Sequence, residues 1–343
     1  MTPRPINLAL QGGGAHGAFT WGVLDRLLRE PTIEIAAISG TSAGALNGAA
    51  LKAGLANGSR ELALENLDWL WDQMGAIRDE RFSWWLDAAS PAAISRMIES
   101  SLPFAVSDAM SRVVSPYAYG PLYRNPLESV ARKLHYDHIC GDAGPAFHIC
   151  ATNVRSGKIR IFQGAEISVQ SILASACLPT LFQAVEIEDP ETGTTEAYWD
   201  GGYTGNPALF PLFTPDLPAD IVIVNINPLY RDELPKSARE IQNRINEISF
   251  NASLLRELRA VSFVQRLLAE GAVAPDAMKK INMHMIADDA LMRQLSVATK
   301  SVPVPQVLHH LRDAGERACD RFLSQHGDKI GQESSVDMVE IFN

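Results

Sequence analysis

Short apolar runs and helical apolar patterns alternate in the first part of the chain. Residues 6–10 (INLAL) and 33–39 (IEIAAIS) have the length and apolar content of buried strands. Each run leads into a glycine-containing turn and then a helical pattern, the first with Phe19, Val23 and Leu27 on one face. The order strand, helix, strand, helix predicts a parallel sheet with right-handed crossovers. In such sheets, ligands bind at the carboxyl ends of the strands.

Further elements are expected along the rest of the chain. A helix is expected from Arg60 to Trp71, and another that begins at Asn125-Pro126-Leu127-Glu128, with Asn as the N-cap and Pro in the first turn. The remaining short apolar runs predict strands near 146–152, 158–162, 183–188, 221–226 and 281–286. Between them, residues 75–123 are rich in aromatic, Pro and Ser residues without a clean period. We expect this stretch to be an insertion that acts as a lid.

Residues 239–269 are expected to form one long helix. A stripe of apolar residues spaced close to 3.5 runs along it, comprising Ile241, Ile245, Ile248, Ala252, Leu255, Leu258 and Leu267. Packing of this stripe across the flank of the sheet is the favoured interpretation. A homodimer formed through 239–269 is the alternative.

Composition excludes several classes of protein. The chain has 343 residues, of which 46% are hydrophobic, so it is not disordered, and its 24 Gly and 20 Pro follow no collagen period. Its net charge of −10, without any Lys/Arg-rich run, predicts no nucleic-acid partner. Four cysteines are too few for a disulfide scaffold, which favours a cytoplasmic location. The sequence has neither a signal-peptide pattern nor an apolar stretch of about 18 residues, so we expect a soluble protein.

The pentapeptide Gly40-Thr41-Ser42-Ala43-Gly44 matches the pattern G-x-S-x-G directly after a predicted strand. This pattern suits a serine nucleophile, because a tight strand-to-helix turn lifts the hydroxyl above the sheet and glycines let the neighbouring backbone approach. The alternative is an ordinary turn in which Ser42 caps the next helix.

A second glycine cluster, GGGAHG at 12–17, matches G-x-G-x-x-G but lacks the acidic residue that a dinucleotide site needs after the next strand. It is also not a P-loop, since no G-K-[ST] closes it. We therefore expect a loop whose backbone N–H groups face an oxyanion beside Ser42. His16 is more naturally part of this loop than a general base.

A serine nucleophile needs a base, and none of His284, His309, His310 and His326 lies in a clear loop after a strand. The strongest candidate is Asp200, which is followed by Gly201 and Gly202. Its alternative is a simple hairpin turn. A metal site at His135, His138 and Cys140 lacks a second ligand pair and is not expected.

Three motifs in order, GGGAHG, GTSAG and DGG, resemble those of the patatin-like phospholipases. The stretches GAFTWGVLDRL, GTSAGALNG, ASACLPTLFQAV and DGGYTGNPAL are similar to bacterial members, and together they cover roughly residues 5–230. The resemblance implies an α/β fold of three layers, α/β/α, around a mostly parallel sheet. It places the hydrolase domain at 5–230, with the lid at 75–123. The remaining 231–343 would be a helical extension with one further strand, packed on the same domain.

The same resemblance implies a Ser–Asp dyad that cleaves carboxyl esters of lipids without a metal or organic cofactor. Ser42 would be the nucleophile and Asp200 the base. Gly12, Gly13, Gly14 and Ala15 would supply oxyanion-hole amides, and Gly40, Gly44, Gly201 and Gly202 would support the turns. Many members have Arg or Lys where this chain has His16.

Two other functions remain open from the sequence. An intracellular aliphatic polyester depolymerase would attack the same kind of bond with the same dyad, and a regulatory protein could retain the fold with little turnover. The expected partner is a lipid or other acyl ester, with transient contact at a membrane surface.

Overall fold

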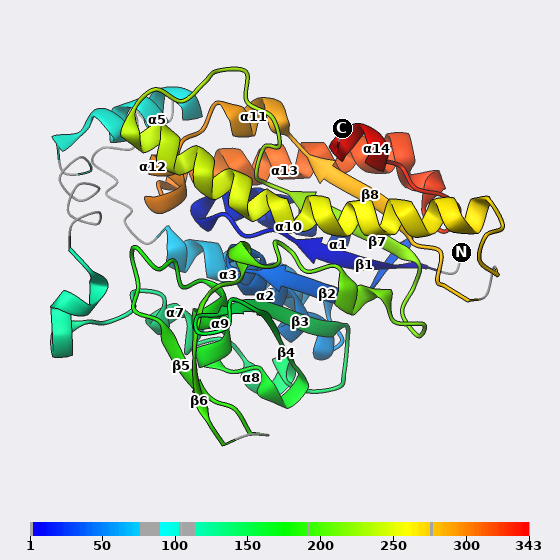
Figure 1. Cartoon of the computed structure of the whole chain (residues 1–343), viewed down its shortest axis with the longest axis horizontal. Coiled ribbons are helices and arrows are strands. Elements are labelled where there is room, and N and C mark those ends of the chain that lie inside the picture. Colours follow the sequence, from blue (N-terminus) through cyan, green and yellow to red (C-terminus); the bar gives the residue numbers. More distant parts are fainter. Residues whose placement is uncertain are drawn as a thin grey trace.

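The computed structural model describes residues 3–75, 90–102, 104, 114–190, 193–274 and 277–342, and its centre is a sheet of eight strands (Figure 1). The strands are β1 (Arg4–Leu10), β2 (Ile33–Thr41), β3 (Ala146–Asn153), β4 (Ile159–Gln163), β5 (Val185–Glu188), β6 (Thr195–Asp200), β7 (Asp220–Asn225) and β8 (Asn282–Ala287). Each strand expected from an apolar run is confirmed, with its ends displaced by no more than two residues.

The sheet is parallel at its centre and antiparallel at one side. Strands β3, β2, β1, β7 and β8 lie in that order, and every neighbouring pair among them is parallel. Strands β4 and β6 both pair antiparallel with β3, and β5 pairs antiparallel with β6. The expected mostly parallel sheet is therefore confirmed.

Helices cover both faces of this sheet, because its central strands are apolar on both sides. In β7, Val222 and Val224 join the core beneath α1 (Ala18–Leu28), α2 (Ala43–Ala56), α3 (Arg60–Met74) and α13 (Pro305–His326). The alternate residues Ile221 and Ile223 pack with α10 (Ala238–Ala269) and α14 (Met338–Phe342) on the other face. The result is the three-layer α/β/α architecture, in which α10 crosses in front of the sheet (Figure 1).

The long helix α10 confirms the predicted extent but not the whole predicted stripe. Leu258 is buried against the sheet, whereas Ile241, Ile245 and Ile248 are 43%, 54% and 54% exposed. The N-terminal half of α10 turns a polar face inward, because its residues Asn243, Asn246 and Glu247 line a cavity rather than the core. Packing of the stripe on the sheet is thus wrong for this half of the helix.

The other α-helices among the described residues are short. They are α5 (Pro91–Ser100), α7 (Glu128–Ala131), α8 (Tyr136–Ile139), α9 (Val169–Ser175), α11 (Asp289–Arg293) and α12 (Val297–Ser301). The Asn125 side chain accepts a 3.0 Å hydrogen bond from the Leu127 N–H, but the helix expected there begins only at Glu128 and ends after one turn.

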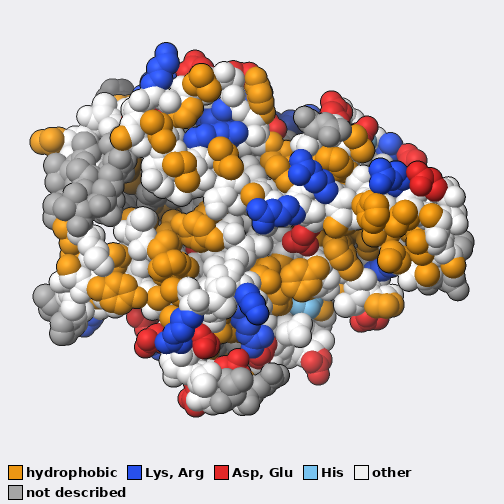
Figure 2. All heavy atoms as spheres, viewed as in Figure 1, with side chains coloured by type: hydrophobic (Ala, Val, Ile, Leu, Met, Phe, Trp, Pro, Cys, Tyr) orange, Lys and Arg blue, Asp and Glu red, His pale blue; other side chains and the backbone are white. Residues whose placement is uncertain are grey.

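On the face crossed by α10, hydrophobic side chains gather in separate patches, with Lys and Arg side chains between them (Figure 2). Within the described ranges, no helix is at once long and apolar enough to cross a bilayer.

Candidate active site

The turn from β2 into α2 holds Ser42 in a backbone conformation that side chains rarely adopt. Its φ of 54° and ψ of −119° make it the one non-glycine residue with positive φ in the described part of the chain. Glycine is required beside it, since a Cβ at Gly44 would lie 2.1 Å from the Leu10 carbonyl oxygen. The Ser42 hydroxyl makes no capping hydrogen bond, so the interpretation as an ordinary N-cap serine is wrong.

Asp200 reaches the same place because β2 and β6 share one edge of β3. Thr41, at the end of β2, pairs with Cys150, and Asp200, at the end of β6, pairs with the next residue, Ala151. Strand β4 pairs with residues 148–152 of β3 and so takes the opposite edge. Because β2 and β6 run in opposite directions, their carboxyl ends meet there, and Asp200 comes to lie beside Ser42.

The Asp200 carboxylate is buried and only half satisfied. It is 1% exposed, and its Oδ1 accepts a 2.7 Å hydrogen bond from the Gly202 N–H. Its Oδ2 has no regular hydrogen-bond partner within the described chain. Burial raises the pKa of Asp200 to about 7, although the Gly202 N–H and the Ser42 side chain act to lower it. The local turn is a 3-10 helix over Gly201–Tyr203, not the simple hairpin considered above.

The glycine loop also lies beside Ser42, since a Cβ at Gly12 would come within 2.6 Å of the Ser42 Cβ. Gly13, Gly14 and Ala15 line the same cavity as Ser42 and Asp200. They lie at the start of the 3-10 helix Gly14–Gly17, where the first backbone N–H groups have no acceptor within the helix. The Gly12 N–H instead donates to Asn206 Oδ1 over 2.6 Å. Gly12 therefore has no amide to offer an oxyanion.

Polar residues that the sequence did not single out hold these pieces in place. The Ser42 N–H donates to Ser175 Oγ, and the Asn206 side chain holds Gly12. Asn227 Nδ2 donates to the Gly12 carbonyl over 2.7 Å and to Gln11 Oε1 over 3.1 Å. Ser175 and Asn206 lie inside the stretches ASACLPTLFQAV and DGGYTGNPAL, which resemble the family, and this position was the only feature of the sequence that pointed to them.

The histidines lie elsewhere. His16 is 1% exposed, and its Nε2 is 2.9 Å from Thr299 Oγ1. Burial, together with the charges of Lys300 and Arg231, lowers the pKa of His16 well below its usual value, so it is neutral. His284 sits in β8, three strands from β2, with its Nε2 2.9 Å from Asp220 Oδ1. No three His, Cys, Asp or Glu side chains are grouped as metal ligands in the ranges described above.

A cavity of about 190 Å³ opens above Ser42 and Asp200. Its apolar wall comes from α2, α3 and the loop after α9, and consists of Leu46, Leu70, Trp71, Met74, Leu178, Leu181 and Phe182. Trp71 both lines this wall and belongs to the core: it is 3% exposed, and its indole N–H donates to Asn47 Oδ1 over 2.9 Å. Of the expected lid, Phe82, Trp84 and Trp85 lie outside the described residues.

A sequence profile described as patatin-like phospholipase matches residues 8–213, which is more than half of the chain. The chain belongs to the patatin-like phospholipase family. Membership supports lipid hydrolase activity in general terms. No curated protein matches this patatin-like chain.

Among solved structures, the patatin-like chain is similar to VipD from Legionella pneumophila, with a TM-score of 0.41 and 14% identity over 94% of this chain and 67% of that one. It is also similar to the type III effector protein ExoU, with a TM-score of 0.33 and 15% identity over 94% of this chain. The ExoU–SpcU complex from Pseudomonas aeruginosa matches with a TM-score of 0.31 and 14% sequence identity over 93% of this chain. The chain spans 54% and 52% of the two ExoU chains.

Proposed function

We propose that the protein is a serine acyl hydrolase that cleaves carboxyl ester bonds of lipids. Ser42 is the nucleophile, Asp200 its general base, and the backbone N–H groups of Gly13, Gly14 and Ala15 form the oxyanion hole. The observation that carries the proposal is the pairing of a hydroxyl that caps nothing with a buried carboxylate oxygen that lacks a regular partner.

The proposed reaction has two steps at one carboxylate. Asp200 Oδ2 accepts the proton of the Ser42 hydroxyl as Ser42 Oγ attacks the ester carbonyl, and the proton then passes to the leaving alcohol. In the second step Asp200 takes a proton from water, which attacks the acyl-serine, and passes that proton to Ser42 Oγ as the fatty acid is released. A free carboxylate with a pKa near 3.9 is a weak base. The raised pKa of Asp200 makes it a stronger one at neutral pH.

The loop amides stabilise the negative charge that develops on the carbonyl oxygen. Loss of one such donor typically lowers turnover by about 10²–10³. The apolar wall of the cavity suits an acyl chain, since binding sites for such ligands are largely apolar.

Reaction with a fluorophosphonate followed by peptide mapping tests the proposal. We expect the label on Ser42, no label in Ser42→Ala, and loss of ester hydrolysis in both Ser42→Ala and Asp200→Asn, neither of which should melt at a lower temperature than the wild type. A regulatory protein with little turnover would give no label in the native state. A panel of phospholipids, lysolipids, short esters and an aliphatic polyester separates a lipase from a depolymerase.

A further inference from the structure

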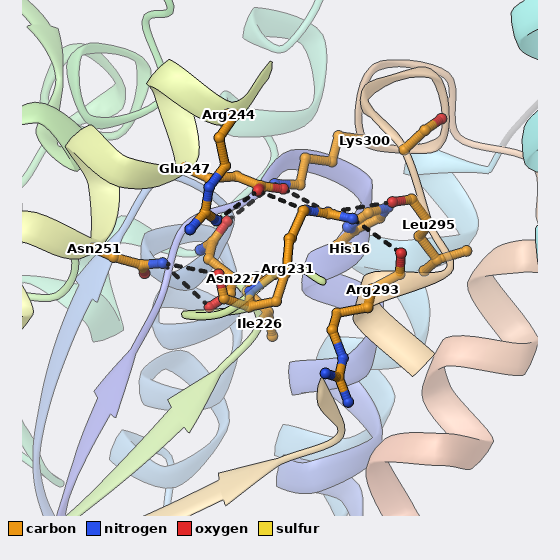
Figure 3. A network of polar contacts seen from close by, with 12 residues as sticks. His16, Ile226, Asn227, Arg231, Arg244, Glu247, Asn251, Arg293, Leu295 and Lys300 are labelled. Carbon is orange, nitrogen blue, oxygen red and sulfur yellow. Dashed lines mark hydrogen bonds and ion pairs between the residues drawn. The ribbon is translucent and has the colours of Figure 1, made fainter. Parts of the chain in front are cut away.

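Three cations surround a single buried carboxylate, Glu247, which lines the same cavity as Ser42 and Asp200. Glu247 on α10 is 1% exposed and accepts hydrogen bonds from Arg231 Nε at 2.8 Å and Arg231 Nη2 at 2.7 Å. Arg244 Nη1 lies 3.4 Å and Lys300 Nζ 3.6 Å from the same carboxylate (Figure 3). Three positive charges against one negative charge leave the cluster with a net charge of +2, within a chain whose net charge is −10.

Burial lowers the pKa of Lys300, and the charge of the ionised Glu247 beside it acts to raise that pKa. Burial acts to raise the pKa of Glu247, but the hydrogen bonds from Arg231 and the charge of Lys300 hold it below its usual value. His16 is neutral, because burial and the charges of Lys300 and Arg231 lower its pKa, and it adds no charge to the cluster.

Of the three cations, Lys300 is the one that faces the cavity with Ser42 and Asp200. The arginines are engaged elsewhere, with Arg231 Nη1 donating to the Arg293 carbonyl at 2.9 Å and Arg244 Nη2 to the Leu229 carbonyl at 3.1 Å. Lys300 Nζ donates to Asn227 Oδ1 at 3.1 Å, and its 3.6 Å contact with Glu247 is longer than a normal hydrogen bond. An ammonium group has three donors, so at least one remains for a ligand even if the contact with Glu247 uses another.

Asn243 and Asn246, one helical turn apart on α10, line the same part of the cavity. Their side-chain amides add neutral donors next to the ammonium. The lining of the cavity thus combines apolar residues, among them Leu178 and Phe182, with Lys300, these asparagines and the Glu247 carboxylate that the arginines neutralise.

We propose that Lys300, Asn243 and Asn246 form an anion subsite that binds the phosphate or carboxylate group of the ester substrate while its acyl chain lies against the apolar wall. This proposal rests on the function proposed above. An anionic oxygen group in the cavity accepts charge-assisted hydrogen bonds from the ammonium, which are stronger than neutral ones. The subsite therefore selects lipids that carry an anion near the scissile ester over neutral esters with the same acyl chains.

The test compares two substrates with identical acyl chains, dioctanoyl phosphatidate and dioctanoylglycerol, in the same nonionic detergent. We expect Lys300→Met to lower kcat/KM for the phosphatidate by about 10- to 100-fold and to leave that for the diacylglycerol within about threefold. Lys300→Arg should restore part of the preference. Lys329→Met, which removes a lysine paired with Glu333 on the surface, should not change the ratio.

Two results would overturn the subsite: no preference for the phosphatidate in the wild type, with or without inhibition by inorganic phosphate, or equal losses on both substrates in Lys300→Met. If the wild type hydrolyses neither lipid, the proposed function has failed. The subsite is then judged by calorimetric titration with inorganic phosphate, for which we expect binding to the wild type and at least about tenfold weaker binding to Lys300→Met.

Discussion

The Ser175 hydroxyl accepts a 2.9 Å hydrogen bond from the Ser42 N–H and donates one of 2.6 Å to the Cys150 carbonyl. Cys150 is also the residue that faces Thr41 across the β2–β3 ladder. A single buried hydroxyl at the end of α9 therefore connects β3 to the turn that carries Ser42. This connection helps to hold Ser42 at its unusual positive φ.

Ser175→Ala should lower both stability and turnover. The change leaves the Ser42 N–H and the Cys150 carbonyl buried without a partner, which costs about 1–3 kcal/mol of the free energy of unfolding. Turnover should fall further than stability alone explains, because Ser42 loses its tether. The measurements are denaturant unfolding and ester kinetics below the unfolding transition.

Ser39→Ala is the matched control, since Ser39 is fully buried in β2 and donates to the Ala208 carbonyl without contacting Ser42. It should cost similar stability and keep kcat within about threefold. Equal losses of kcat in the two variants would show that Ser175 has no special role at the turn.

The raised pKa of Asp200 predicts how activity depends on pH. Since the carboxylate form acts as the base, kcat/KM for a neutral ester should rise with pH and level off above an apparent pKa of about 7. Glu257 has a pKa of about 7 for the same reason, burial, and its Oε2 accepts hydrogen bonds from the Leu209 and Phe210 N–H groups. Glu257→Gln should keep the rise, and its disappearance in that variant would assign the rise to Glu257.

The same shift predicts a pH-dependent stability. The pKa of Asp200 is higher in the folded protein, about 7, than its ordinary value of 3.8, so the folded state holds this proton more tightly. The resulting stabilisation is complete below about pH 4 and is lost as the pH rises through about 7. Relative to Asp200→Asn, which cannot titrate there, the wild type should lose up to about 4 kcal/mol of unfolding free energy over this range. Parallel curves for the two proteins would contradict the shift.

The sequence predicted the candidate catalytic residues better than the residues that hold them in place. Ser42 and the glycine loop follow neighbouring parallel strands, so their proximity follows from the βαβ pattern alone. Asp200 ends an antiparallel strand, and only the pairing of β6 beside the end of β2 explains its position. Ser175, Asn206 and Asn227 act through single hydrogen bonds between distant segments, and no local pattern marks such contacts.

The polar inner face of α10 could not be predicted for a related reason. Ile241, Ile245 and Ile248 look like the buried stripe of a helix, yet the cavity beneath this half of α10 recruits its polar residues instead. An apolar period shows which residues share a helix face, whereas the neighbouring elements decide which face is covered.

His284 should matter for stability and not for chemistry. It is fully buried in β8, with its Nε2 2.9 Å from Asp220 Oδ1 and its Nδ1 3.0 Å from Ser335 Oγ. His284→Ala leaves the Asp220 carboxylate without this partner and should lower the unfolding free energy by about 1–3 kcal/mol. At temperatures where the variant is folded, kcat should stay within about tenfold of wild type. A loss near 10⁴ would instead indicate a Ser–His–Asp triad.

Three single variants, His309→Ala, His310→Ala and His326→Ala, extend this test to the histidines of α13. None of these histidines lines the cavity. Each variant should also keep kcat within about tenfold, and a large loss in any of them would reopen the assignment of the base.

Phe182 and Trp71 both line the apolar wall, but they should respond differently to truncation. Phe182 is half-buried, so Phe182→Ala should lower activity on long-chain esters relative to short-chain ones while the melting temperature changes little. Trp71 stacks on Trp21, with ring centroids 6.3 Å apart, and bonds to Asn47. Trp71→Ala should therefore cost about 3–5 kcal/mol and depress all substrates together. Chain-length profiles recorded beside melting curves distinguish the two, and a uniform loss in Phe182→Ala would show that Phe182 does not contact the acyl chain.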